Sequence, residues 1–322
     1  MSKKNVTLEE GKLKGIKLHS LWLRERLIGD DFVDQNNLQR LYEPSLINEN
    51  LLIKDLIIED KFLNVTFTDG VKGKINIDEI YDEINSIDCI PEKKIWEKND
   101  KLQVFDNNKI YQDKNNLIEM LNSFYEYGYV IIENTKAEEN EVINFAEKLG
   151  SVRTTNWGKL FNVISKPNPN DLAYTALELK SHSDNPYRKP VPGIQLLHCI
   201  ANESTGGDSS LVDGFSVAEH LKLNHRDFYD ILTKTSVIFK FTDVDVILEN
   251  KSKLIELDSD GNFKQISFSG RLDYVPLLND KHLDIFYKAR KCMYELCNSD
   301  QFKIKFRLSK GMIAMFDNLR TL

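Results

Sequence analysis

The sequence predicts a mainly β fold with helices (α+β), in which a small β-rich N-terminal domain precedes a double-stranded β-helix, or jelly-roll, core. Two observations predict it. Residues 1–95 are strand-like, and the rest opens with two helices and continues as many short strands with helical inserts. A length of 322 residues is enough for two unequal domains. We therefore predict domains at 1–95 and 104–322, separated by the charged stretch 91–103.

The elements follow from local patterns. Residues 51–77 alternate apolar and polar side chains around Asp69-Gly70, which indicates a hairpin. An amphipathic run ended by Gly128, an apolar run and a second amphipathic run predict helix 116–127, strand 129–135 and helix 137–149. Further helices are predicted at 216–235 and 281–298, and strands at 236–241, 253–257, 263–269, 302–308 and 312–316. Five of the eight prolines lie between 167 and 192 and exclude a long helix there.

Composition excludes several classes of protein. The formal net charge is -7 and no long basic stripe is present, which disfavours nucleic-acid and anionic-membrane partners. No apolar stretch approaches the roughly 20 residues that span a bilayer, and the N-terminus has no apolar core typical of a secretory signal. Cysteines 89, 199, 292 and 297 form no C-x-x-C motif, and we expect them to be reduced thiols. We therefore expect a cytoplasmic protein.

A His-x-Asp motif occurs three times, and helical geometry distinguishes the three. Residues 225–227 and 282–284 fall inside predicted helices, where positions i and i+2 point about 200° apart and read as solvated faces. His182 and Asp184 lie in non-helical sequence before Pro186, and in extended chain such positions project to one side. They would supply two-thirds of the 2-His-1-carboxylate triad that holds non-haem Fe(II). On spacing alone, a polar loop remains the alternative.

The surrounding sequence resembles a known family. Residues 173–215 contain HSD (182–184), PGIQLLHC (192–199) and GGDS (206–209). This run resembles the core of the Fe(II)/2-oxoglutarate dioxygenases of the taurine dioxygenase superfamily, and within it the γ-butyrobetaine hydroxylase and trimethyllysine dioxygenase branch. WLRER (22–26) resembles the small N-terminal domain of that branch. The resemblance covers nearly the whole chain.

The resemblance implies Fe(II) as cofactor, 2-oxoglutarate as co-substrate and O2 as the second co-substrate. It implies His182 and Asp184 as metal ligands, and Ser209 as a hydrogen-bond donor to the 2-oxoglutarate carboxylate. A turn serine after two glycines is the alternative for Ser209. His198 lies outside the triad and reads as a core histidine. No side chain is predicted as a catalytic acid, base or nucleophile.

The implied substrate is a small quaternary amine that is hydroxylated. A trimethylammonium group donates no ordinary hydrogen bonds, so aromatic faces must recognise it by cation–π attraction. Trp157, Phe161 and Tyr174 lie where the family places such residues, with core packing as the alternative. Arg271 would anchor an anionic end of the substrate or form a surface ion pair.

Two departures from the family shape the expectation. No cysteine precedes position 89, so we predict no structural zinc in the N-terminal domain. The family's distal His and its 2-oxoglutarate-binding Arg follow the segment that matches FDNLRTL (316–322), which ends this sequence. We therefore expect a C-terminally truncated member that is inactive alone. The alternative is a non-catalytic pseudoenzyme that binds a quaternary amine or pairs with an intact homologue. A homodimer is also compatible with the resemblance.

Overall fold

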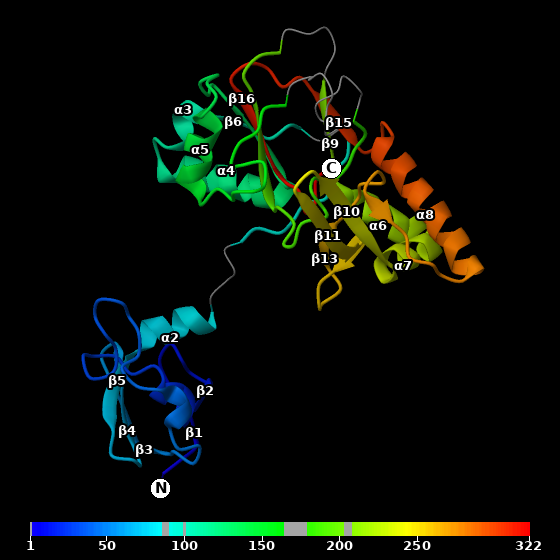
Figure 1. The fold of residues 1–322 in the computed structure, drawn as a ribbon. Helices are drawn as coiled ribbons and strands as arrows, with labels where there is room; N and C mark the ends of the chain where they lie inside the picture. Colours follow the sequence, from blue (N-terminus) through cyan, green and yellow to red (C-terminus); the bar gives the residue numbers. More distant parts are fainter. Residues whose placement is uncertain (1, 86–89, 99–100, 164–178, 203–207) are drawn as a thin grey trace. The chain divides into compact units, whose positions relative to one another are not determined.

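The computed structural model describes residues 2–85, 90–98, 101–163, 179–202 and 208–322 of the chain. It divides into two compact units, Met1–Cys89 and Ile90–Leu322, which are drawn in Figure 1. The charged stretch 91–98 belongs to the second unit. Trp96 is buried there, and its indole N–H donates to the carbonyl of Tyr127 at 2.6 Å.

The first unit is built on an antiparallel sheet with the order β3-β4-β5. The predicted turn at Asp69-Gly70 joins β4 to β5 and is confirmed, with a φ of 88° at Gly70. A second turn at Asp60, with a φ of 53°, lacks the glycine that would mark it in the sequence. The elements are β1 (Asn5–Thr7), β2 (Lys17–His19), α1 (Ser20–Arg24), a 3-10 helix (Pro44–Leu46), β3 (Ile53–Glu59), β4 (Phe62–Phe67), β5 (Lys72–Asn76) and α2 (Ile77–Ile84).

The second unit contains a four-stranded sheet with the order β6-β7-β16-β8, in which β6 and β7 run parallel and the other neighbours antiparallel. Strand β7 is buried on both faces because its alternate side chains enter two different cores. Three helices pack on one of these faces (Figure 1). The elements are β6 (Val104–Asp106), α3 (Asn107–Ile110), α4 (Lys114–Tyr127), β7 (Tyr129–Glu133), α5 (Glu141–Leu149), β8 (Ile194–Cys199) and β16 (Met312–Asp317).

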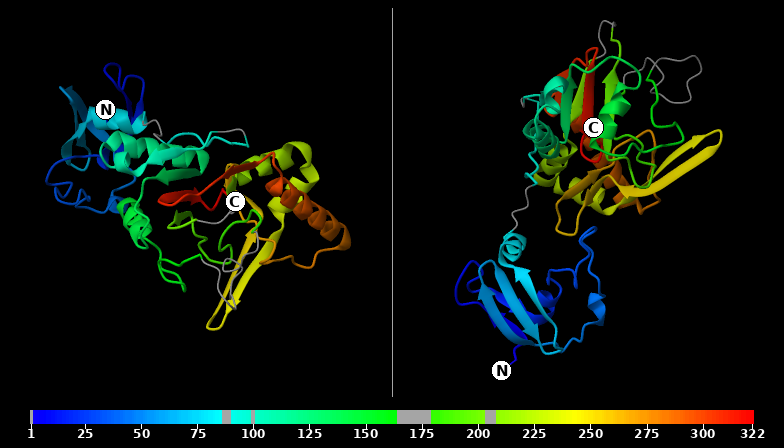
Figure 2. Two further views of the ribbon diagram at one scale, coloured as in Figure 1. Left: turned by 90° about the horizontal axis from the view of Figure 1, so that it is seen from above. Right: turned by 90° about the vertical axis from the view of Figure 1, so that its left-hand side faces the viewer.

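The other elements of this unit enclose the largest hydrophobic cluster of the described residues. Helices α6 (Gly214–Asn224), α7 (Arg226–Lys234) and α8 (Asp280–Asn298) pack there against strands that form three small antiparallel sheets. The pairs are β9 (Ser209–Val212) with β15 (Lys303–Phe306), β12 (Ile255–Leu257) with β13 (Phe263–Ile266), and β10 (Ser236–Asp243) with both β11 (Val246–Lys253) and β14 (Asp273–Tyr274). Figure 2 shows the β10–β11 hairpin, in yellow, extending outward from its unit. The result is a mixed α/β fold.

Most predicted elements of the second unit are confirmed, but the helix predicted at 216–235 is wrong in one respect. The chain leaves helical geometry at His225, with a φ of -141° and a ψ of 63°, so two helices form. Asn224 and His225 are weak helix formers, and the break lets α7 pack against α8. Strand β11 is not predicted, because its charged side chains hide the alternation. No helix in the described part of the chain is long and apolar enough to cross a membrane.

Candidate functional site

The segment that carries His182 and Asp184 is anchored by the residue between them. Ser183 is buried, its backbone N–H donates to the carbonyl of Phe268 at 2.8 Å, and its hydroxyl accepts from the N–H of Phe268 at 2.7 Å. With the middle residue directed into the protein, the side chains of His182 and Asp184 come together, and Nε2 and Oδ1 lie 3.2 Å apart. The side chains of His182 and Asp184 are 25% and 45% exposed, so both are accessible to a small ligand.

A second anchor comes from the segment after β16. The buried side chain of Asn318 accepts from the backbone N–H of Asp184 at 2.7 Å and donates to its carbonyl at 2.8 Å. The same amide nitrogen donates to the carbonyl of Pro192 at 2.9 Å, just before β8. The position of Asp184 is therefore fixed by a strand that lies in the four-stranded sheet.

The hydrogen bonds of His182 define its tautomer. Its Nδ1 lies 2.7 Å from the carbonyl of Lys180, and a carbonyl can only accept, so Nδ1 carries a proton. Nε2 is then left for another partner, and it lies 3.2 Å from Oδ1 of Asp184. A histidine that ligates a metal characteristically donates its other ring N–H to a carbonyl or carboxylate in this way.

The pair fits a first-row divalent cation in geometry and in donor type. With ligand distances of about 2.1 Å, two ligands at a right angle lie about 3 Å apart, close to the separation found here. Among the described residues, no group of three or more His, Cys, Asp or Glu side chains gathers at one point, so the described part supplies two protein donors. Ser181 and Ser269 flank this segment and its Phe268 anchor, and each has a buried hydroxyl without a hydrogen-bond partner. Such orphaned groups are typical of a place that receives a ligand or water.

The surroundings of His182 both raise and lower its pKa. Burial lowers the pKa of His182, but the hydrogen bond and negative charge of Asp184 and the carbonyl of Lys180 raise it, and the pKa ends above its ordinary value. The positive charge of Arg271 opposes this rise, which places Arg271 within electrostatic range of the imidazole. Arg271 itself is exposed.

Two of the three predicted aromatic residues lie together. The rings of Trp157 and Phe161 are 5.7 Å apart at 57°, and Trp157 also meets Phe241 edge-on at 5.4 Å. The guanidinium of Arg188 lies 5.3 Å from the Trp157 ring centre, so this ring already contacts a cation. The third, Tyr174, lies outside the described residues. Trp157 thus contacts both the hydrophobic core and the segment that follows Asp184.

The remaining predicted residues lie on other elements. Ser209 begins β9 and pairs with Phe306 of β15, and among the described residues no hydrogen bond or ion pair joins it to His182 or Asp184. His198 lies on β8, where burial lowers its pKa and its Nε2 is 3.2 Å from the hydroxyl of Thr135. His282 and Asp284 lie within α8, as predicted, whereas His225 lies between α6 and α7.

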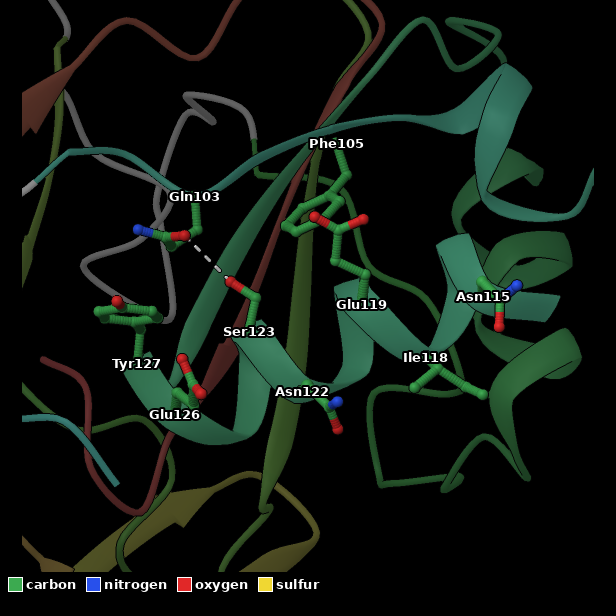
Figure 3. A pocket seen from close by; sticks show the side chains of 9 residues that line it. All are labelled: Gln103, Phe105, Asn115, Ile118, Glu119, Asn122, Ser123, Glu126 and Tyr127. Atoms are coloured by element: carbon green, nitrogen blue, oxygen red, sulfur yellow. Dashed lines mark hydrogen bonds between the residues drawn. The ribbon is translucent and has the colours of Figure 1, made fainter. Parts of the chain in front are cut away.

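Sequence reasoning missed Asn318 and Arg188. Asn318 stands 134 residues from Asp184, and no local pattern marks so distant a contact. For Arg188 there was a signal, since a charged residue lies between Pro186 and Pro190 in the segment that follows the His-Ser-Asp motif. The structure also holds a shallow pocket of about 410 Å³ that is lined by α4 and by Gln103 and Phe105 at β6 (Figure 3). Its lining, which includes Gln103, shares no residue with the site around His182.

Comparison with known proteins identifies the family. Residues 93–322 match the family model described as "Taurine catabolism dioxygenase TauD, TfdA family". The chain is 28% identical over 326 residues to a gamma-butyrobetaine dioxygenase of Pseudomonas sp. (strain AK-1), covering 99% of this chain and 85% of that protein. It is 30% identical over 319 residues to the gamma-butyrobetaine dioxygenase of Homo sapiens, covering 94% and 82%.

The fold agrees with that family. A solved taurine dioxygenase from Burkholderia xenovorans superposes with a TM-score of 0.51 over 71% of this chain and 82% of its own, at 15% identity. Such a likeness shows a shared fold. The family model matches residues 93–322, which is most of the chain. The human relative, which is 30% identical over 94% of the chain, independently supports the same family. The chain therefore belongs to the TauD/TfdA family and is, by family, a 2-oxoglutarate-dependent dioxygenase.

Proposed function

We propose that this protein hydroxylates a small trimethylammonium compound, with Fe(II) as cofactor and 2-oxoglutarate and O2 as co-substrates. The observation that carries the proposal is the pair formed by Nε2 of His182 and Oδ1 of Asp184, which lie 3.2 Å apart on a segment that Ser183 anchors. The names of the Pseudomonas and human relatives support γ-butyrobetaine as the first substrate to test. The segment 104–322 would form the jelly-roll domain and residues 1–95 the small N-terminal domain of this branch.

In this proposal His182 and Asp184 hold the metal. Bound Fe(II), with 2-oxoglutarate and O2, supplies the oxidising chemistry that inserts an oxygen atom into a C–H bond. The protein's contribution is orientation. The Nδ1–H of His182 donates to the carbonyl of Lys180, which keeps the lone pair of Nε2 directed away from it. Ser183 and Asn318 fix the backbone on which both ligands stand.

The other residues are assigned to the two organic ligands. The hydroxyl of Ser209 would donate to a carboxylate oxygen of 2-oxoglutarate. Trp157 and Phe161, whose rings lie 5.7 Å apart, would contact the trimethylammonium group through their aromatic faces, together with Tyr174. Arg271, within electrostatic range of His182, would add positive charge beside the metal and favour anionic ligands.

Metal binding and turnover test the proposal separately. Anaerobic titration with Mn(II), followed calorimetrically, is expected to show one site in the wild-type chain, with binding lost in His182→Ala and in Asp184→Ala. In the presence of Fe(II) and O2, γ-butyrobetaine should stimulate the conversion of 2-oxoglutarate to succinate, and this result would contradict the expectation that the chain is inactive alone. Substrate-stimulated succinate formation and a hydroxylated product, both measured by mass spectrometry, support the assignment.

The chain offers its own control. His282 and Asp284 repeat the same His-x-Asp spacing as exposed residues within α8, so His282→Ala should leave Mn(II) affinity unchanged. Equal loss in His182→Ala and His282→Ala would refute a specific site at His182. Binding of γ-butyrobetaine without any succinate formation would favour the non-catalytic alternative instead.

A further inference from the structure

Arg188 lies four residues after Asp184 in a tight turn. Asn185 adopts a left-handed φ of 51°, and the backbone N–H of Arg188 donates to the carbonyl of Asn185 at 3.0 Å. The residue is only 8% exposed. Its guanidinium lies 5.3 Å from the ring centre of Trp157 and 5.6 Å from that of Tyr187. This buried cation is therefore held between aromatic rings directly beside the candidate metal segment.

Among the described residues, no carboxylate pairs with Arg188. Its hydrogen bonds go to two amide oxygens: Nη2 donates to Oδ1 of Asn156, and Nε donates weakly, at 3.4 Å, to Oδ1 of Asn185. Arg320, the other deeply buried arginine of this unit, has a complete set of partners that includes both oxygens of Asp213. Nη1 of Arg188 makes no hydrogen bond among the described residues. It is also not one of the fully buried polar atoms that lack a partner. Among the described residues it is therefore accessible to solvent.

The charge balance around Arg188 favours an anion. Burying a cation without a counter-charge is costly, and an anionic ligand would offset that cost. A second cation, Arg153, is close: its Nη1 donates to the carbonyl of Pro190 at 2.7 Å. After burial, the charge of Arg153 is a further cause that lowers the pKa of Arg188. Two positive charges and an open Nη1 thus meet at one place.

We propose that Arg188 binds a carboxylate group of a ligand of the neighbouring metal site, through its free Nη1 and the adjoining face of its guanidinium. The proposal rests on the proposed function. The carboxylate would come from the anionic end of the quaternary-amine substrate or from 2-oxoglutarate. A trimethylammonium group, in contrast, is repelled by Arg188 and Arg153, so it must lie away from the Arg188 side of Trp157. Arg271 is exposed, whereas Arg188 is held in one place by four side chains.

Two ligands that differ only in the carboxylate group measure its contribution to binding. γ-Butyrobetaine and n-butyltrimethylammonium share the cationic group and chain length, but the second has no carboxylate. Each is titrated calorimetrically, without iron, into the wild-type chain, Arg188→Met and Arg188→Lys, and 2-oxoglutarate is titrated with Mn(II) present. We expect Arg188→Met to lower the affinity for one of the two carboxylate ligands about 10- to 100-fold, which is the effect of losing a charge-assisted hydrogen bond. Binding of n-butyltrimethylammonium should change less than about 3-fold. Arg188→Lys, which keeps the charge but loses the planar fork, should fall between.

The titrations show whether the carboxylate that Arg188 binds belongs to the substrate or to 2-oxoglutarate, and which results would refute the proposal. A selective loss for γ-butyrobetaine assigns Arg188 to the substrate, and one for 2-oxoglutarate assigns it to the co-substrate. Equal losses for γ-butyrobetaine and n-butyltrimethylammonium would show that Arg188 only supports Trp157, and would overturn the proposal. Failure of the wild-type chain to bind either carboxylate would overturn it too. Arg226→Gln, which removes an exposed arginine on α7 that has no role in the site, serves as the charge control, and circular dichroism checks folding. None of these readouts needs turnover, so loss of the proposed hydroxylation would leave this result interpretable.

Discussion

The side-chain amide of Asn318 holds Asp184 by both of its backbone groups, accepting from the N–H at 2.7 Å and donating to the carbonyl at 2.8 Å. The Asn318 amide thus bonds to the same two backbone groups of Asp184 that a residue of a neighbouring β-strand would bond to. Because Asn318 follows β16 directly, the candidate ligand Asp184 is tied to the four-stranded sheet. The rigidity of the sheet is thereby transmitted to an exposed side chain.

Replacement of Asn318 by alanine removes three partly buried hydrogen bonds and leaves backbone groups of Asp184 and Pro192 without these partners. We expect a loss of about 2–4 kcal/mol in the free energy of unfolding. We also expect Mn(II) affinity to fall about 10-fold, since partners that orient a ligand typically contribute that much. Urea denaturation and calorimetric titration measure the two effects.

Asn224→Ala is the matched control for this change. The Asn224 side chain makes one exposed hydrogen bond, to the carbonyl of His220 at 3.0 Å, so the effect on stability should stay within about 0.5 kcal/mol. If Asn318→Ala destabilised the chain but left Mn(II) affinity intact, the link between the sheet and the metal segment would be refuted.

The sequence predicts what depends on local period and fails where distant segments meet. The helix before Gly128 and the strand that follows it are confirmed, because amphipathic period and a left-handed glycine are local signals. The absence of helix at the His-Ser-Asp segment is similarly local, since nearby prolines exclude helix. Asn318 could not be assigned from the sequence, because its role depends on a distant tertiary contact, and the only local signal for Arg188 was its charge between two prolines. The break at His225 also escaped prediction, because the low helix propensity of Asn224 and His225 is only a weak local signal.

Ser183 offers a second way to loosen the candidate ligands without touching them. Ser183→Ala removes the oxygen that accepts from the N–H of Phe268 at 2.7 Å and leaves that buried N–H unpaired. We expect a loss of about 1–3 kcal/mol in the free energy of unfolding, measured by urea denaturation. In Ser299→Ala the lost bond is from a half-buried hydroxyl to a helix-terminal carbonyl, so the loss should be smaller. Equal losses in the two variants would contradict the anchoring role of Ser183.

A buried ion pair secures the segment beyond Asn318. Arg320 and Asp213 are both 0% exposed, and Nε and Nη2 of Arg320 each donate to one carboxylate oxygen, at 3.0 and 2.7 Å. Nη1 donates to the carbonyl of Glu126 at 2.7 Å, so each guanidinium nitrogen has a partner. Arg320→Met should cost about 3–5 kcal/mol of stability, because it leaves the charge of Asp213 buried and unpaired.

The test for this pair is a double-mutant cycle followed by urea denaturation. Arg320→Met combined with Asp213→Asn should cost less than the sum of the single changes, since the second change removes the charge that the first leaves unpaired. The exposed pair of Arg226 and Asp230 on α7, 3.0 Å apart, should show a coupling of only about 0.5 kcal/mol. Additive costs at Arg320 and Asp213 would mean that the two side chains do not interact as a unit.

Asp273 is a carboxylate whose burial outweighs its ion pair. Its side chain is 1% exposed, Oδ1 accepts from Nη1 of Arg290 at 2.8 Å, and Oδ2 is buried without a hydrogen-bond partner. Burial raises the pKa of Asp273, and the charge and hydrogen bond of Arg290 only partly offset the rise. In the unfolded chain the pKa of an aspartate is about 3.9. The folded state therefore retains the proton to higher pH than the unfolded state does.

This difference in pKa has a definite sign for stability. Stability contributed by the retained proton is present at low pH and is lost as the pH rises above about 4 and through the folded-state pKa of Asp273. Asn resembles the neutral carboxylic acid and does not titrate. The free energy of unfolding of the wild type, minus that of Asp273→Asn, should therefore decrease between about pH 4 and pH 7 in urea denaturation series. Because both proteins share every other titrating group, the difference isolates Asp273. A difference that stays constant or grows with pH would show that the ion pair with Arg290, rather than burial, dominates at Asp273.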